Sequence, residues 1–191
     1  MSTAEFADLL RRAQQGDESA FNALFRDTQP VVLKYLAAIA GIGTAEDIAS
    51  DTWVSVVRDL GRCTAADTAT FRAWVLSIAR RRWVDEVRRR ARRPEVLLES
   101  APDVTTAPQD VESSADEAAG TRWALGVLRL LPADQAEVIA LRVIADLDVH
   151  TTAQIVGKTA GATRVLAHRG LRRLAELLAD VTNPASGTTE G

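Results

Sequence analysis

The sequence predicts an all-α protein built from two small helical domains, and three observations support this fold class. Alanine, leucine and arginine recur along the 191 residues, and these residue types favour helices. Apolar residues return at spacings of three and four, and no segment alternates in the manner of a strand. The helical pattern stops near residue 93 and resumes near residue 121, so we expect domains over 1–93 and 121–180.

A segment of opposite charge lies between the two expected domains. Eight arginines fall within 80–93, whereas 94–120 holds seven acidic residues, three prolines and no Lys or Arg. Prolines and grouped acids cannot supply a packed core, so the sequence predicts a flexible acidic linker over 94–120. The small, polar residues of 181–191 predict a mobile tail.

The first domain is expected to begin with helices on either side of a break at Gly16. Apolar residues follow helical spacing over 6–10 before the break. Asp17, directly after it, is placed to cap the next helix by accepting a hydrogen bond from a backbone N–H. A second break at 41–43 separates this region from the next helix.

The helix expected from residue 44 carries acidic side chains close to an aromatic one. Glu46, Asp47 and Asp51 are near Trp53 in the sequence. Acids in a first turn favour the helix dipole without any further role. An exposed patch of acids and an aromatic ring would also suit the docking of a basic protein surface, and the residues alone leave both interpretations open.

A long helix over 70–90 combines a buried stripe with a run of arginines. Phe71, Trp74 and Ile78 make the stripe, and the arginines of 80–93 follow. Closely spaced like charges repel each other and need a counter-surface. Nucleic-acid phosphates are the counter-surface that arginine suits best.

Residues 148–178 have the layout of a helix-turn-helix, with Asp148 as a cap and a turn at 157–159. Leu171 and Leu174 belong to the sector of the second helix expected to pack on the domain. Its other side fits the major groove, with Arg164 at a base and later arginines at phosphates, unless the basic face is merely solvated. The candidate DNA contacts are Thr159, Gly161, Arg164, Val165, His168, Arg169 and Arg172.

Several functional classes are not expected from the sequence. Cys63 is the only cysteine, and no run approaches the roughly 20 apolar residues of a membrane span, so we expect a cytoplasmic protein without membrane insertion. Cys63, His150 and His168 lack the spacing of metal ligands. Because there is also no glycine-rich phosphate loop and no catalytic triad order, we expect neither a cofactor nor an enzyme.

Motifs along nearly the whole chain resemble those of the extracytoplasmic-function (ECF) sigma factors, which are subunits of bacterial RNA polymerase. Residues 16–21 (Gly-Asp-Glu-Ser-Ala-Phe) are similar to the opening motif of the family. Residues 45–53 resemble its polymerase-docking segment, and 71–80 with 85–90 resemble the segment that opens and reads the −10 element. Residues 131–138 are similar to the beginning of the family's second domain.

The resemblance implies a specificity subunit that binds core RNA polymerase and promoter DNA. It implies docking on the clamp helices of the largest subunit through Asp47, Asp51 and Trp53. It implies that the loop over 62–70 captures a flipped base, and that the −10 element is bound by Arg62, Asp67, Arg80, Arg81 and Arg88. It also implies that the second domain reads the −35 element and meets the flap of the second-largest subunit, and that an anti-sigma factor controls the protein.

Two other functions compete with this interpretation. A stand-alone transcriptional regulator with a helix-turn-helix would explain 121–180 equally well, but it would not explain an arginine run followed by an acidic linker. A helical adaptor that binds only proteins would show no affinity for DNA even at low salt, where phosphate contacts are strongest.

Overall fold

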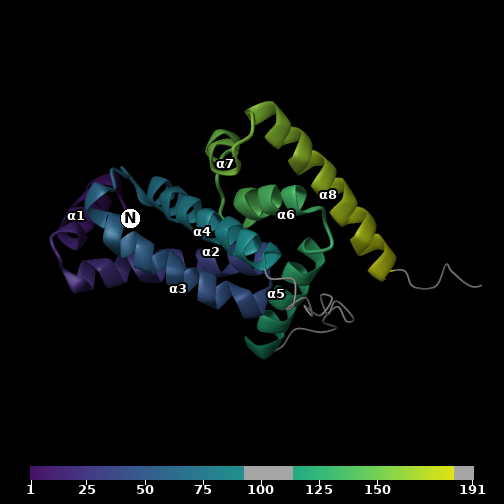
Figure 1. Ribbon diagram of the computed structural model, residues 1–191, viewed down its shortest axis with the longest axis horizontal. Coiled ribbons are helices and arrows are strands. Elements are labelled where there is room, and N and C mark those ends of the chain that lie inside the picture. Colours follow the sequence, from purple (N-terminus) through teal and green to yellow (C-terminus); the bar gives the residue numbers. More distant parts are fainter. Residues whose placement is uncertain (93–113, 183–191) are drawn as a thin grey trace, which may run out of the picture.

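The computed structural model describes residues 1–92 and 114–182, and every secondary-structure element in these ranges is a helix (Figure 1), which confirms the all-α class. The side chains of 114–118 and 180–182 fall outside the description. The first range holds α1 (Thr3–Gln14), α2 (Glu18–Ala40), α3 (Ile42–Asp59), the single turn η1 (Leu60–Arg62) and α4 (Thr68–Ala91). The second holds α5 (Ser114–Leu128), α6 (Ala133–Ile139), the π-helical turn η3 (Ala140–Ile144), α7 (Val149–Val156) and α8 (Ala160–Thr182).

The acidic linker expected over 94–120 lies mostly outside the described residues, but its last part is helical. Helix α5 begins at Ser114 and not near residue 121. The sequence from 114 to 119 is Ser-Ala-Asp-Glu-Ala-Ala, in which the alanines favour helix and the acids complement the positive end of the helix dipole. The tail expected over 181–191 lies outside the description beyond the end of α8 at Thr182.

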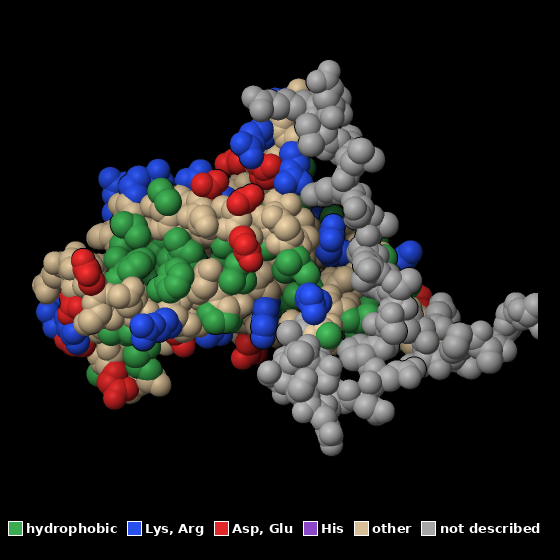
Figure 2. Space-filling view, turned by 90° about the horizontal axis from the view of Figure 1, so that it is seen from below, with side chains coloured by type: hydrophobic (Ala, Val, Ile, Leu, Met, Phe, Trp, Pro, Cys, Tyr) green, Lys and Arg blue, Asp and Glu red, His purple; other side chains and the backbone are tan. Residues whose placement is uncertain are grey.

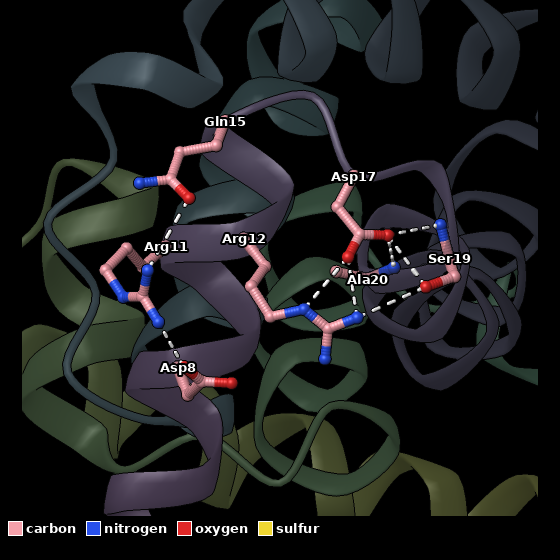
Figure 3. A network of polar contacts seen from close by, with 7 residues as sticks. All are labelled: Asp8, Arg11, Arg12, Gln15, Asp17, Ser19 and Ala20. Atoms are coloured by element: carbon pink, nitrogen blue, oxygen red, sulfur yellow. Dashed lines mark hydrogen bonds and ion pairs between the residues drawn. The ribbon is translucent and has the colours of Figure 1, made fainter.

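The corner between α1 and α2 is held by the carboxylate of Asp17, which confirms the predicted cap (Figure 3). Its Oδ1 accepts hydrogen bonds from the backbone N–H groups of Ser19 at 2.9 Å and Ala20 at 3.1 Å. Arg12 donates to Oδ2 from Nε at 2.9 Å and from Nη2 at 2.6 Å. The hydroxyl of Ser19 also donates to Oδ1 at 2.7 Å. All of these hydrogen bonds, with that of the Ser19 hydroxyl as the largest cause, hold the pKa of Asp17 well below its ordinary value.

The helices of the N-terminal half pack around large apolar side chains. Phe6 of α1, Tyr35 of α2 and Phe71 of α4 are completely buried. The ring centroids of Phe6 and Phe71 lie 6.0 Å apart, and Trp74 adds a further ring at 5.7 Å from Phe71. Aromatic side chains at these distances bury large apolar areas and fix the angle at which α1 and α4 meet.

In the C-terminal half, α8 lies directly on α6 because one residue on their interface has no side chain. Gly170 of α8 is buried, and a Cβ there would lie 2.6 Å from Cδ1 of Ile139 and 3.2 Å from Cβ of Gln135. The glycine therefore allows a close approach of the two backbones. Val138 and Leu141, both completely buried, complete this part of the core.

The two halves pack against each other and do not stand apart (Figure 1). Helix α2 contacts α5, α6 and η3, and α4 contacts α7. Gly41 permits one close contact at this seam, since its φ is +86° and a Cβ would lie 2.9 Å from Nη1 of Arg129. Buried residues of both halves form one continuous core, so the two halves of the described chain are packed together through this shared core.

Replacement of Phe71 by alanine is expected to lower the free energy of unfolding by about 3–5 kcal/mol, because it leaves a cavity beside Phe6 and Trp74. Val87→Ala on the same helix is the matched control, since Val87 is exposed and its truncation should change stability by no more than about 0.5 kcal/mol. Urea unfolding followed by circular dichroism measures both variants. Equal losses in the two variants would contradict the aromatic core.

Candidate functional site

Helix α3 presents a narrow stripe of acidic and apolar side chains to solvent. Asp47, Asp51 and Val54 lie on successive turns of one face, and all are exposed. Val54 is 71 % exposed and the neighbouring Val57 is 58 % exposed. Figure 2 shows hydrophobic side chains gathered on the underside of the N-terminal half, with charged side chains around them. Exposed apolar groups rimmed by charges are typical of a surface that binds another protein.

Trp53, which the sequence predicted as part of this stripe, lies beneath it. Its side chain packs against Phe21 at a centroid distance of 6.0 Å and against Phe25 at 4.7 Å. The indole Nε1 donates a hydrogen bond to Gln29 at 2.5 Å, and only 7 % of the residue is exposed. Trp53 therefore fixes α3 against α2, and Val54, which sequence reasoning missed, is the exposed apolar residue next to it.

Charged side chains from η1 and α4 converge on Asp59 at the end of α3. Arg58 donates to its carboxylate from Nε at 3.2 Å and from Nη2 at 3.0 Å. This pairing lowers the pKa of Asp59 below its ordinary value, and the charges of Arg62 and Arg81 add to the effect. The structure thus brings together Arg62 and Arg81, two of the residues implicated in −10 binding, at one end of the N-terminal half.

The loop after η1 is fixed at both ends by hydrogen bonds. Gln14 of α1 donates from Nε2 to the backbone oxygens of Leu60 at 3.0 Å and Cys63 at 2.9 Å. Asp67 caps α4 by accepting from the backbone N–H of Thr70 at 2.8 Å, which is the foremost cause of its lowered pKa. The carboxylate of Asp67 therefore shapes the loop, and burial raises the pKa of the Cys63 thiol, which makes that thiol unreactive.

The arginine run on α4 divides into residues that hold the fold and residues that face solvent. Arg82 donates to the hydroxyl of Ser55 on α3 from Nε at 3.0 Å, and Arg90 donates to the hydroxyl of Thr44 on α3 from Nη2 at 3.1 Å, so both join α4 to α3. Arg81 and Arg88 lie two turns apart on one exposed face. These exposed arginines form a cationic surface, to which the cluster at Asp59 adds Arg62.

Arg80 lies on a different side of α4 from the other predicted −10 residues. Its Nε donates to Oε1 of Glu137 on α6 at 2.7 Å. Its Nη2 donates to the backbone oxygen of Val156 on α7 at 3.4 Å. The structure therefore turns Arg80 toward the C-terminal half and away from the surface of Arg81 and Arg88.

Capping residues fix where α7 begins and ends and where α8 begins. Asp148 accepts from the backbone N–H groups of His150 at 2.7 Å and Thr151 at 3.1 Å. Helix α7 ends at Gly157, whose φ of +68° lies in the left-handed region that favours glycine. Thr159 then accepts from the backbone N–H of Ala162 at 3.2 Å, so the turn between the helices is closed by local hydrogen bonds.

One face of α8 is free of packing, and the opposite face lies against α6 and α7. Thr163 and Gly170 are buried, whereas Leu171, predicted to pack on the domain, is 50 % exposed. The buried face is therefore turned slightly from the predicted sector, because the close approach at Gly170 sets the rotation of the helix. The exposed residues include all of the predicted DNA contacts: Thr159, Gly161, Arg164, Val165, His168, Arg169 and Arg172.

An apolar groove of about 340 Å³ lies between α5, η3 and α8. Its walls include Trp123, Leu128 and Leu174, with Val143 and Leu171 exposed at its edge. Sequence reasoning missed this groove. The helical spacing of Val143 relative to the apolar residues before it was a signal that its side chain lies on an apolar face. The residues on the other walls of the groove come from helices distant in the sequence, so the groove itself could not be predicted.

Within 1–92 and 114–182, no three His, Cys, Asp or Glu side chains come together as a metal site would require. In the same residues, no helix combines the length and the apolar character needed to cross a membrane.

Known proteins resemble this chain in sequence and in fold. Residues 24–93 match the family described as sigma-70 region 2. The ECF RNA polymerase sigma factor BldN of Streptomyces coelicolor is 32 % identical over 179 residues, which cover 93 % of this chain and 67 % of BldN. ShbA of Streptomyces griseus, also an ECF sigma factor, is 32 % identical over 185 residues, covering 92 % of this chain and 96 % of ShbA.

The chain belongs to the ECF family of RNA polymerase sigma factors. Its fold is similar to that of the sigma factor RpoE from Bartonella quintana, solved in complex with the anti-sigma factor NepR, with a TM-score of 0.67 at 22 % identity over 83 % of this chain and 96 % of that one. Sigma factors regulate transcription together with RNA polymerase, and the stand-alone regulator considered above is not favoured.

Asp148→Asn is expected to reduce the acid sensitivity of the second half. Hydrogen bonds from the hydroxyl and the N–H of Thr151 and from the N–H of His150 lower the pKa of Asp148 from 3.8 to about 2. The stabilisation from this charged cap is present in full above 3.8 and is lost as the pH falls toward about 2. The measurement is the melting temperature of both proteins at intervals through this range, in which the difference between them should shrink on acidification. A constant difference would show that the charge of Asp148 does not matter.

Proposed function

We propose that the exposed stripe of α3, formed by Asp47, Asp51 and Val54, docks on the clamp helices of the largest subunit of core RNA polymerase. The acids suit a basic partner surface, and Val54 offers an apolar contact that loses water on binding. Trp53 supports this stripe from beneath through its contacts with Phe25. The single observation that carries the function is family membership over nearly the whole chain, and the exposure of this stripe gives docking a location.

The −10 element would be bound by the cationic surface that Arg62 of η1 forms with Arg81 and Arg88 of α4. All three are exposed and would hold phosphates of the nontemplate strand, and Arg80 would join them once it is released from Glu137. The loop fixed by Gln14 and Asp67 follows Arg62 directly in the chain, and we propose that it receives a flipped base. A fixed loop suits this task because little conformational entropy is lost when the base binds.

The −35 element would be read by α8 in the major groove. Residues at its N-terminal end, from Thr159 and Gly161 to Arg164 and Val165, would meet base edges, with Arg164 as the base contact. His168, Arg169 and Arg172 would meet phosphates or the groove wall. Support comes from the segregation of the helix, whose basic residues are exposed and whose opposite face is buried.

The C-terminal half would also meet the flap of the second-largest polymerase subunit through the apolar groove between α5, η3 and α8. Its walls are almost wholly apolar, which suits one face of an amphipathic segment. In this proposal 1–93 and 121–180 act as separate domains in the cytoplasm, and the chain itself catalyses no reaction, because nucleotide addition belongs to the core enzyme. RpoE of Bartonella quintana was solved with an anti-sigma factor, and we propose that this chain is controlled by one.

The function is tested by run-off transcription from fragmented genomic DNA with purified core polymerase and the full chain. Discrete new transcripts that depend on the chain are the expected result. Binding to duplex DNA without binding to core polymerase would contradict the proposed function and would support the stand-alone regulator.

Asp51→Arg is expected to abolish binding to core polymerase, because it places a positive charge against a basic partner surface. Asp8→Arg is the matched control, since Asp8 is an exposed acid of α1 outside the stripe. Pull-down of core polymerase on the tagged variants measures binding, and thermal melting checks that both variants fold. Retained binding by Asp51→Arg would remove α3 as the docking surface.

Arg164→Ala is expected to weaken binding to a promoter −35 element by about 1–3 kcal/mol and to relax the preference at a single base position. Arg11→Ala, an exposed arginine of α1, should leave the affinity unchanged. Fluorescence anisotropy with duplexes that differ at one position measures both effects. A uniform loss across all duplexes would assign Arg164 to a phosphate and not to a base.

A further inference from the structure

One carboxylate of the second half, that of Glu137 on α6, closes the seam between the two halves. Arg80 of α4 donates to it from Nε at 2.7 Å and from Nη2 at 3.4 Å. The hydroxyl of Tyr35 on α2 donates to the same carboxylate at 3.1 Å. The side chains of Arg80 and Glu137 are only 27 % and 14 % exposed, and Tyr35 is buried. Two helices of the first half are thus tied to one side chain of the second.

Arginine binds a phosphate with the same geometry that it uses in this contact with a carboxylate. Carboxylate and phosphate both offer paired oxygens to the planar guanidinium of arginine. Nη2 of Arg80 is further engaged by the backbone oxygen of Val156 at 3.4 Å, and α7 packs on α4 at this place. The Nε and Nη2 edge of Arg80 is therefore occupied by the protein, and a DNA phosphate can bind at this edge only by displacing Glu137.

The seam is hollow beside this contact. A hollow of about 440 Å³ adjoins the ion pair, lined among others by Trp83, Arg129 and Lys158. The hydrogen bonds to Glu137, sheltered from solvent and therefore weakly screened, act together with the shared apolar core in keeping the halves together.

We propose that Glu137 is an internal competitor of promoter DNA, which holds the unbound chain closed and withholds Arg80 from the −10 element. The inference rests on the proposed function, since it needs Arg80 to be a −10 contact in the open form. DNA that requires Arg80 must break this latch. By linkage, the factor by which the latch weakens DNA binding is also the factor by which DNA binding weakens the latch, so loss of the latch must strengthen DNA binding. The hydroxyl of Tyr35 keeps its proton and donates a hydrogen bond to Glu137, because burial, and next the charge of Glu137, raises its pKa.

The state of the latch can be measured as a distance between the halves. Asp8 and Glu176 are exposed on the two halves, and spin labels on cysteines at these positions, in a Cys63→Ser background, report their separation. The full chain is expected to give one narrow distance distribution. Glu137→Gln removes the charge that holds Arg80 and is expected to give a broader distribution that extends to longer distances.

Asp134→Asn is the matched control for this measurement. Asp134 is an acid of the same helix, and its ionic partner is Lys158 at 3.9 Å, within the second half. Its substitution leaves the contacts of Glu137 in place, so the narrow distribution should be kept. An equal broadening in both variants would overturn the latch, since it would reflect a general loosening of α6.

The consequence for DNA is measured with a single-stranded oligonucleotide that carries the −10 nontemplate sequence of a promoter found by run-off transcription. Glu137→Gln is expected to bind it about fivefold more tightly than the unaltered chain, the lower range of ordinary coupling between sites. In an Arg80→Ala background the same substitution should bring no gain. An absent gain, or a gain that persists without Arg80, would overturn the proposal.

Different outcomes contradict the latch and the proposed function. If the distances in Glu137→Gln match those of the unaltered chain, the latch is wrong even where the chain supports transcription. If the proposed function is wrong, core polymerase yields no chain-dependent transcript with any seam variant, whatever the distances show. Should Glu137→Gln lose its thermal transition, Tyr35→Phe takes its place, because it removes one donor from the same carboxylate and should shift distance and affinity in the same direction by less.

Discussion

The arrangement of this protein depends on the burial of α2 from nearly every side. The helix packs against α1, α3 and α4 of its own half and against α5, α6 and η3 of the other. In its second half it carries apolar or small side chains over most of its circumference, and Val32, Leu36 and Ala38 are completely buried while Lys34 is exposed. A helix that is apolar on nearly every side is stable only inside a protein, so the two halves share this helix as an inner wall and their separation exposes it.

Local signals in the sequence predicted those parts of the structure that depend only on residues close together in the chain. The caps at Asp17 and Asp148 and the end of α7 near Gly157 each depend on groups within a few residues, and the structure confirms them. The all-α class follows from the same short-range periodicity. The start of α5 was missed because a grouping of acids with serines at 112–117 is also typical of a linker, and only the following alanines favour helix.

Contacts between distant residues could not be predicted in this way. Arg80 and Glu137 are 57 positions apart, and Arg82 and Ser55 are 27 apart, so a run of arginines that looks uniform in the sequence is divided by its neighbours in space. The ring of Trp53 is another example, since helical spacing does not reveal that α2 covers it. Candidate site residues can thus be predicted by type, but which of them face a ligand is settled by the helices that pack beside them.

The division of α8 into a buried and an exposed face has a consequence for evolution. Thr163 and Gly170 hold the helix on α6 and α7, and the residues on the opposite face are exposed and contribute little to folding stability. Exchanges on the exposed face can therefore accumulate without loss of the fold. Under the proposed role of α8 in reading DNA, a lineage that duplicates this gene can redirect the copy to new promoters through a few side chains, while the scaffold that carries them is inherited unchanged.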